Sequence, residues 1–327
     1  MNTERKAEPL ERPNIPEMDA LLGSPQSVLD HGFVRLIDYM GDDAAIVQAA
    51  RVSYGKGTKS VNDDRGLIRY LMSHRHTTPF EMCEIKLHVK LPIFVARQWI
   101  RHRTANVNEQ SARYSILTNE FYVPAPEDVK PQSKANRQGR DGEFPEDVVT
   151  AMTETIRQQS TGAFEIYEEL HSGWPWYAPD GERTGISQGD GQFDPAPEPH
   201  GKGHGMAREL ARTVLPVNAY TEWYWKVDLH NLLHFLSLRA DPHAQKEIRV
   251  YAQAIYNLVH TWVPLACEAF DDYVLGAKRF SRQEMQVIRA ALMHSPVIGM
   301  AENLADAGMS KREINEFLEK LDLGNGG

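Results

Sequence analysis

The segment from Glu84 to Pro92 constrains the fold of this chain more than any other feature. Aliphatic residues alternate along it with charged or polar ones: Ile85, Leu87, Val89 and Leu91 against Glu84, Lys86, His88 and Lys90. A period of two predicts a β-strand in a sheet with one wet face. Pro92 ends this strand, and the apolar run after it predicts a helix with proline at or near its first turn.

Apolar residues at helical spacing occupy much of the remaining chain. Asp42 and Asp43 precede one short capped helix, and Asp63 and Asp64 precede another, so two helices are expected before the first strand. Further helices are predicted over 145–171, 206–215, 229–238 and 244–270, and a second, aromatic strand over 217–227. The elements do not alternate regularly as βαβ units, and no GxGxxG follows a strand. The pattern favours an α+β fold, a mixed or antiparallel sheet with packed helices, and disfavours a Rossmann fold.

Changes in composition predict how the chain is divided. Residues 1–30 carry proline and serine without sustained periodicity, which indicates an N-terminal arm packed on a partner. Residues 31–271 are expected to form the main domain. Within it, a stretch rich in Gly, Pro, Asp and His at 172–205 is expected to be an insertion or mobile loop. Residues 272–327 are expected to form a C-terminal helical extension.

Composition disfavours several classes of protein. The 327 residues are 41% hydrophobic and 25% charged, which suits a globular protein that buries one large core or two modest ones. Of the two cysteines, Cys83 and Cys267, neither belongs to a CxxC pair, so no disulfide framework or thiolate zinc site is indicated. We expect a protein of the reducing cytoplasm, with no export signal and no membrane span.

The net charge of −9 opposes general affinity for nucleic acids, so an anionic ligand must be bound locally. The obvious place is the segment 97–113, where four arginines face one acid: Arg97, Arg101, Arg103 and Arg113 against Glu109. On a helix, Arg97 and Arg101 would share a face. Guanidinium groups repel each other unless anions or acids lie among them, so a phosphate ligand explains the segment better than a solvated basic face does.

The same segment carries a specific motif. Arg101-His102-Arg103, followed after seven residues by Ser111, resembles the defining motif of the flavin-dependent thymidylate synthases. Flanking matches extend the resemblance over roughly Phe33 to Phe270: Ala50–Ser53, His76–Glu81, Pro92–Trp99, Ala211–Pro216 and Leu238–Gln245. The arm, the insertion and the C-terminal extension lie outside it.

The resemblance implies an FAD enzyme that methylates dUMP reductively to dTMP. In that family methylenetetrahydrofolate is the carbon donor, and FAD recharged by NADPH is the reductant. Matched position by position, the dUMP site would be lined by Gln98, Trp99, Ile100, Arg101, Glu109, Gln110, Ser111, Ala112, Arg113, Arg212 and Arg239. FAD would contact Thr78, Arg101, His102, Arg103, Glu109, Asp228, Leu229, His230 and His234, with His76 beside the flavin and the folate. Since Arg101 matches both sets, nucleotide and cofactor are expected to be adjacent.

By the same match, Arg239 is the activating residue. A guanidinium held against uracil N3 and its carbonyl oxygen favours the N3-deprotonated, electron-rich ring, which raises nucleophilicity at C5 without a covalent enzyme nucleophile. The structural alternative is an ion pair of Arg239 with Asp241. Ser111 with backbone N–H groups, and Arg113 with a charge-assisted hydrogen bond, would hold the phosphate.

The chain departs from the family pattern at four positions. The family often carries serine at the position of Asn106, and often asparagine or arginine at the positions of Asp228, His230 and His234. An Asp in place of Asn exchanges a hydrogen-bond donor for a charge near an anionic cofactor.

Two functions of other classes stay open at this point. A zinc hydrolase could use histidines at helical spacing and elsewhere, namely His230 and His234 with His74, His76, His200 and His204, although the motif lacks the glutamate of a zinc protease. A non-catalytic RNA-binding module could use the arginines with Tyr114, Phe121 and Tyr122 as stacking platforms, which the negative net charge opposes.

The other type of thymidylate synthase would need a cysteine nucleophile. Cys83 lies beside a strand and Cys267 late in a helix, so both indicate core packing. The resemblance further implies a homotetramer with active sites shared between subunits. Small-molecule substrates are the expected partners, and no metal, nucleic acid or membrane is expected.

Overall fold

The computed structural model describes residues 14–52, 61–134, 139–172, 176–177, 183–184, 205–293 and 300–321. The chain divides into two compact units, residues 1–275 and 276–327, and each is described by itself. Within the described residues, no helix has the length and apolar character that crossing a membrane requires.

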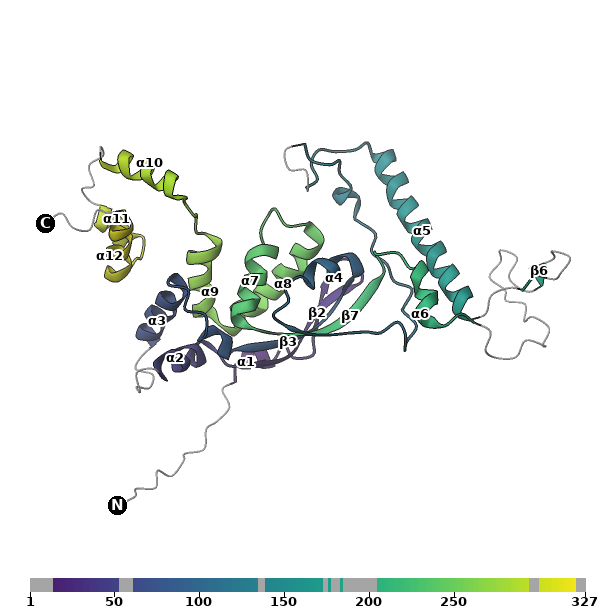
Figure 1. Cartoon of the computed structure of the whole chain (residues 1–327), viewed down its shortest axis with the longest axis horizontal. Helices are drawn as coiled ribbons and strands as arrows, with labels where there is room; N and C mark the ends of the chain where they lie inside the picture. The colour runs from purple at the N-terminus through teal and green to yellow at the C-terminus, as the bar shows by residue number, and fades with distance from the viewer. Residues whose placement is uncertain are drawn as a thin grey trace, which may run out of the picture. The chain divides into compact units, whose positions relative to one another are not determined.

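A five-stranded antiparallel sheet lies at the centre of the first unit (Figure 1). Its strands follow the order β1 (Pro25–Val28), β2 (Gly32–Met40), β3 (Glu84–Pro92), β7 (Tyr220–Asp228) and β4 (Asn106–Glu109). The predicted alternation in β3 is confirmed, because its aliphatic residues are buried and those between them are half-buried. β3 pairs with β7 from Glu84 opposite Asp228 to Pro92 opposite Tyr220. The α+β prediction with an antiparallel sheet is therefore confirmed.

Helices α4 (Ile93–Trp99), α7 (Leu229–Arg239) and α8 (Lys246–Trp262) pack on the apolar face of this sheet (Figure 1). α4 follows β3 directly and α7 follows β7 directly. Because these two strands are paired, their helices lie next to each other on the apolar face of the sheet. Trp99 of α4 lies at ring-centroid distances of 5.7 Å from Trp223, 5.1 Å from Trp225 and 4.6 Å from Phe235. Aromatic pairs at such spacing contribute about 0.5–1.5 kcal/mol each beyond their buried area. They fix α4 against β7 and α7.

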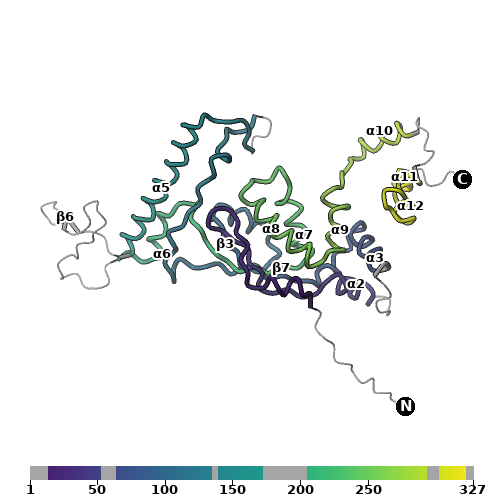
Figure 2. The backbone as a smooth tube through the Cα atoms, turned by 180° about the vertical axis from the view of Figure 1, so that it is seen from behind, coloured from purple at the N-terminus to yellow at the C-terminus, as the bar shows by residue number. Residues whose placement is uncertain are grey.

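A second group of helices packs together away from α4, as both views show (Figure 2). It contains α2 (Asp43–Arg51), α3 (Val61–Ser73) and α9 (Pro264–Phe270). Asp42 caps α2 by accepting the Ala45 N–H at 2.8 Å, and Asp43 caps α9 by accepting two backbone N–H groups at 2.8 and 3.0 Å. Burial raises the pKa of Asp43 to about 6 in spite of these bonds.

Helix α5 (Glu146–Ser172) and the short α6 (Arg208–Ala211) share a smaller core. Phe164, Tyr167, Ala211 and Ala219 are its buried residues. A 3-10 turn, Arg212–Val214, continues α6. Two short strands, β5 (Trp176–Tyr177) and β6 (Arg183–Thr184), pair with each other in a separate antiparallel sheet. Most of the predicted insertion at 172–205 lies outside the described residues.

The second unit contains α10 (Arg282–Met293), α11 (Met300–Asp306) and α12 (Lys311–Lys320). Ser310 and Glu313 form a capping box at the start of α12. Arg289 of α10 donates to the carbonyl oxygen of Lys320 at 2.9 Å, which ties the first helix to the last.

The structure corrects four expectations. Two helices were expected before the first strand, but a short helix and two strands precede α2 and α3. The strand β2 was missed because its pairing shifts register between Leu36 and Asp38, which interrupts the alternation. Residues 14–30 contribute α1 (Pro16–Asp19) and β1 to the fold of their own chain, and Met18 is fully buried. The helix predicted over 244–270 ends at Trp262, and Pro264, which lacks an N–H, begins another. The helix predicted over 206–215 is one short turn of α-helix and one of 3-10 helix.

Candidate functional site

The ends of α4 and α7 meet at Gln98, and they form the first group of predicted site residues. Arg239, the last residue of α7, donates from Nη2 to the carbonyl oxygen of Gln98 at 3.4 Å. Its Nε donates to Nε2 of His102 at 3.0 Å. The Gln98 side chain donates from Nε2 to Oε1 of Gln245. One hydrogen-bonded cluster, which we call the Arg239 cluster, therefore contains Gln98, His102, Arg239 and Gln245.

The electrostatics of this cluster fix the protonation of His102. Burial, then the charge of Arg239 and then His234 lower the pKa of His102 to about 4. The ring is thus neutral near pH 7, and its Nε2 accepts from Arg239, so the proton lies on Nδ1. Burial also lowers the pKa of Arg239, although a guanidinium keeps its charge at any physiological pH.

The ion pair between Arg239 and Asp241, which the sequence left open, is not the arrangement found. Asp241 accepts from the backbone N–H of His243 at 2.7 Å and lies 2.9 Å from its ring Nδ1. Arg239 turns instead toward His102 and Gln98. The guanidinium is therefore held by neutral acceptors and keeps its positive charge for an electron-rich ligand.

The predicted FAD contacts at the start of α7 differ in their surroundings. Asp228 caps the helix: Oδ1 accepts the Asn231 N–H at 2.9 Å, and Oδ2 accepts the Asn231 side chain at 2.7 Å. Leu229 is fully buried, whereas His230 is half-buried and His234 exposed. The ring centroids of His234 and His102 are 5.9 Å apart. Helix capping thus gives Asp228 a structural use that asparagine could also supply.

His76 and Thr78 lie on the segment between α3 and the 3-10 turn Phe80–Met82, and both are exposed. That turn packs against α7, so this segment neighbours the start of α7. The His76 ring lies 5.7 Å from the Tyr70 ring. Arg75, just before it, has a φ of 57°, a left-handed conformation that costs a side-chain-bearing residue about 1 kcal/mol or more. Such strain tends to cluster at functional segments.

The second group of predicted residues lines a cavity of about 360 Å³. Its walls are Ile93, Glu109, Gln110, Ser111, Ala112, Leu117, Arg212, Leu215 and Thr221. We call it the Ser111 cavity. Glu109 Oε1 accepts the hydroxyl of Thr221 at 2.7 Å, and the Gln110 N–H donates to the carbonyl oxygen of Glu222 at 2.8 Å, so β7 carries this wall. Ala112, which also lines the cavity, is buried.

A tight turn at Ser111 presents polar groups beside this cavity. Its carbonyl oxygen accepts the N–H groups of Tyr114 and Ser115 at 3.1 and 3.2 Å, and its Oγ accepts the N–H of Arg113 at 3.3 Å. Arg113 Nη2 lies 3.2 Å from Glu209 Oε2, with both side chains about half exposed. Such a surface pair contributes only about 0–1 kcal/mol, so an incoming phosphate can compete for the guanidinium.

Three other arginines of the motif segment are exposed. Among the described residues, Arg97, Arg101 and Arg103 have no carboxylate partner. The expectation that Arg97 and Arg101 share a helix face is wrong, because α4 ends at Trp99 and Arg101 lies in the turn that follows. Ile100 is exposed there as well, whereas Trp99 is buried in the aromatic core and can reach a ligand only through its backbone. The motif therefore places Arg101 and Arg103 in and after a turn, without carboxylate partners in the part of the chain that the structure describes.

The Arg239 cluster and the Ser111 cavity are two distinct groups, although α4 contributes to both, with Gln98 in the first and Ile93 in the second. Hydrogen bonds link the members of the first, and β7 with the segment 109–117 links those of the second. In the part of the chain that the structure describes, no hydrogen bond or ion pair runs from one group to the other. The sequence match assigned members of both groups to a single dUMP site.

The alternative chemistries find little support. Burial raises the pKa of the Cys83 thiol to about 12 and that of Cys267 further, so neither is a ready thiolate. Over the residues with described positions, no three His, Cys, Asp or Glu side chains are grouped as a metal site requires. His200 and His204 lie outside those residues.

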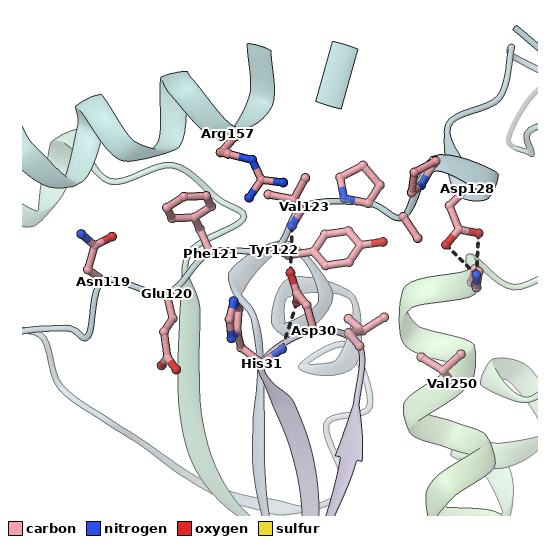
Figure 3. Close-up of a pocket in the computed structure, with 15 residues that line it drawn as sticks. Asp30, His31, Asn119, Glu120, Phe121, Tyr122, Val123, Asp128, Arg157 and Val250 are labelled. Carbon is pink, nitrogen blue, oxygen red and sulfur yellow. Dashed lines mark hydrogen bonds and ion pairs between the residues drawn. The ribbon is translucent and has the colours of Figure 1, made fainter. Parts of the chain in front are cut away.

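A larger cavity of about 710 Å³ contains none of the residues predicted for the dUMP or FAD site, but Phe121 and Tyr122 of the RNA-binding alternative line it. Figure 3 shows it between α5, which contributes Arg157, the hairpin of β1 and β2, which contributes Asp30 and His31, and the segment 119–128. Asp30 accepts the Val123 N–H at 3.1 Å and the Tyr220 hydroxyl, so it fastens this segment to the sheet. The cavity is a feature of how the segment packs.

Sequence reasoning missed two residues of these groups. Thr221 was missed because it lies among the aromatic residues of β7 and gave no signal beyond the strand pattern. Gln245 lay at the end of a matched segment, but only the fold brings it to Gln98, 147 positions away.

Comparison with known proteins gave three consistent findings. Residues 35–265 match the family model Thy1, described as thymidylate synthase complementing protein. The chain is 51% identical over 311 residues to the flavin-dependent thymidylate synthase of Gluconobacter oxydans, covering 95% of this chain and 92% of that protein. It is 54% identical over 313 residues to that of Ruegeria pomeroyi, covering 96% and 93%. It also resembles a UMP/dUMP methylase, PolB from Streptomyces cacaoi, solved with 5-Br dUMP: the TM-score is 0.61 at 31% identity, over 76% of this chain and 99% of that one.

Proposed function

This chain belongs to the flavin-dependent thymidylate synthases, and from that premise we propose that its Arg239 cluster and its Ser111 cavity bind the two ends of dUMP. The enzyme methylates dUMP to dTMP, with methylenetetrahydrofolate as carbon donor and with FAD and NADPH as the reducing system. The observation that carries the proposal is the contact of Arg239 with His102 and Gln98, which presents a cation on neutral supports.

The Arg239 guanidinium acts on the uracil ring. Held against N3 and the neighbouring carbonyl oxygen, it stabilises the negative charge of the N3-deprotonated ring and so makes C5 a better nucleophile. Its partial burial strengthens this interaction, because water screens the charge less. Neutral His102 orients the guanidinium without neutralising it.

The phosphate belongs at the Ser111 turn. The Ser111 hydroxyl donates to a phosphate oxygen, while Arg113 and Arg212 supply charge-assisted bonds. The weak surface pair of Arg113 with Glu209 leaves that guanidinium available. Glu109 and Gln110 form the wall toward β7.

The residues that would hold FAD fit an anionic dinucleotide in part. Arg101 and Arg103 are exposed and lack carboxylate partners among the described residues, which suits a pyrophosphate. Thr78, His102, His230 and His234 offer polar groups nearby, and His76 is our candidate for the flavin and folate side. Asp228 already caps α7, and Leu229 would contribute only its backbone. When bound and reduced, FAD supplies the hydride of the reaction.

No thiol is needed in this scheme. Both cysteines are buried with raised pKa values, and Arg239 replaces the covalent nucleophile as the activating group. We expect measurable turnover in the double variant Cys83→Ala/Cys267→Ala. Loss of all activity in a folded, flavin-loaded double variant would return the cysteine mechanism to consideration.

We further propose a homotetramer whose active sites are shared between subunits. The two groups are separate within one chain, so two copies would together present an Arg239 cluster and a Ser111 cavity to one dUMP. Residues 31–271 would form the catalytic domain and 272–327 an extension, with the enzyme in the cytoplasm and without nucleic-acid or membrane partners.

The proposal is tested by the absorption spectrum of the purified protein. A flavin band that shifts on titration with dUMP, and does not shift with thymidine, is the expected result. Protein that remains colourless after reconstitution with FAD would contradict the proposed cofactor site. A flavin band that is insensitive to dUMP would contradict the proposed substrate site.

A further inference from the structure

The neighbours of Gln98 extend the Arg239 cluster into the core of the protein. Gln98 lies where three elements meet: it is near the end of α4, its carbonyl oxygen accepts from Arg239 of α7, and its side chain donates to Gln245. Gln245 is the N-cap of α8 and is exposed. An exposed glutamine has many rotamers, so something must hold its amide toward Gln98.

Glu247, two residues after Gln245, is buried and hydrogen-bonded, and so holds the start of α8 in place. It is 2% exposed, and its Oε1 accepts from Arg140 Nη2 at 2.8 Å and from the Tyr122 hydroxyl at 3.0 Å. Burial raises the pKa of Glu247, but hydrogen bonds, that from Arg140 first among them, lower it below its ordinary value. The carboxylate is therefore charged, and it also lies in the first turn of α8, where negative charge is favoured.

A buried ion pair of this kind is a poor device for stability alone. Removing two charges from water offsets most of their attraction, and an apolar replacement is often as stable. Arg140 also donates from Nη1 to the carbonyl oxygen of Asp128, and the adjacent Lys246 pairs with the Asp128 carboxylate. These contacts fasten the start of α8 to the segment 128–140. They therefore fix the backbone position of Gln245 at the start of α8.

We infer that Glu247 and Gln245 are positioning residues for the uracil end of the active site. Glu247 fixes the start of α8 and with it the backbone that carries Gln245, Gln245 accepts from the Gln98 side chain and so fixes it, and Gln98 stands beside Arg239 in the dUMP site. The inference rests on the proposed function. Neither residue touches the substrate, and both act through Gln98.

The test uses the FAD-loaded enzyme and follows the flavin band during titration with dUMP. Gln245→Met keeps the size of the side chain but removes its hydrogen bonds, and the dissociation constant for dUMP should rise about fivefold, the loss expected for one net hydrogen bond. Flavin content and the melting temperature should stay unchanged. The matched control is Gln132→Met, since Gln132 lines the same cavity of about 550 Å³ as Gln245 but bonds to Gly139. It should bind dUMP like the unaltered enzyme.

A double-mutant cycle separates positioning from a general effect. Gln98→Met/Gln245→Met should bind dUMP no more weakly than Gln98→Met alone, because both changes remove one link. Additive losses, or a Gln245→Met variant that titrates like the Gln132→Met control, would overturn the inference. Glu247→Gln should weaken dUMP binding to a similar degree; if it fails to fold, the Gln245 arm alone decides. Failure of the unaltered enzyme to respond to dUMP would instead reject the proposed function.

Discussion

At the scale of single residues, Arg239 is the side chain whose chemistry is most demanding. In the role that we propose for it, Arg239 must remain charged, reach the uracil ring and avoid a carboxylate that would neutralise it. The structure meets the first and third conditions by giving it His102 and a carbonyl oxygen as partners. A lysine could not donate in two directions from one rigid plane, so Arg239→Lys is not a conservative change here.

Arg239→Ala should lower kcat by about 100- to 1,000-fold, since it removes a preorganised donor to developing negative charge. Steady-state turnover of dUMP by the flavin-loaded variant measures the effect. Arg157→Ala is the matched control, because Arg157 is exposed on α5 and paired only weakly with Glu154. An Arg239→Ala enzyme that turns over dUMP at an undiminished rate would refute the activation mechanism.

His102 should titrate near pH 4 in the ligand-free enzyme, as followed by NMR of its ring protons. Its folded pKa lies below the ordinary 6.5, so the unfolded chain binds more protons between these values. The stability that this histidine contributes is therefore complete above about pH 6.5 and is lost as the pH falls toward 4. Because burial is the larger cause, Arg239→Leu should raise the pKa only part of the way. A ring that titrates above 6 would show that His102 is not held as described.

At the scale of elements, two strand-to-helix junctions position the residues of the Arg239 cluster. β3 leads into α4 and β7 leads into α7, and the two strands are paired over their full lengths. Gln98 and Arg239 therefore lie on neighbouring helices although they are 141 positions apart. The pairing of β4 with β7 brings Glu109 to Thr221 in the same way. Strand register thus decides which motif residues meet.

Gly32 tests this element-level arrangement, because it starts β2 where α8 crosses the sheet. A Cβ there would lie 2.0 Å from the Tyr251 hydroxyl and 2.6 Å from the Val28 carbonyl oxygen. Gly32→Ala should therefore destabilise the protein by about 1–3 kcal/mol or more, as overpacking does. Gly162→Ala on α5 meets nothing within 4 Å and should be stabilising by about 0.5–1 kcal/mol. Urea unfolding of both variants checks the contrast; equal effects would mean that Gly32 is not so enclosed.

At the scale of the whole molecule, the separation of the Arg239 cluster from the Ser111 cavity is the main feature to explain. A single ligand that needs both groups is served when a symmetric oligomer brings one group from each of two chains together. In the homotetramer that we propose, an isolated chain would supply only one of the two groups to each dUMP, so assembly would be needed for catalysis.

Subunit mixing checks this directly. Arg239→Ala and Arg212→Ala should each be nearly inactive alone, because each removes a guanidinium from every site. After dissociation and joint reassembly, mixed oligomers should regain part of the activity, since some sites combine an intact Arg239 with an intact Arg212. If each chain carries a complete site, no mixed oligomer contains more intact sites than its parents, and activity stays absent.

The sequence alone determined a good deal of this protein. The alternation in β3 and the helical spacing around it gave the α+β class, because local pattern records which face of an element is buried. The motif from Arg101 to Ser111 indicated the family, because this spacing of cationic residues and a serine is specific to it. Tertiary structure decided the rest: that α4 stops before Arg101, that Arg239 bonds to His102 and Gln98 and not to Asp241, and that the matched residues form two groups. The bonds of Arg239 to His102 and Gln98 join segments more than 100 positions apart, and only strand register and core packing determine such distances.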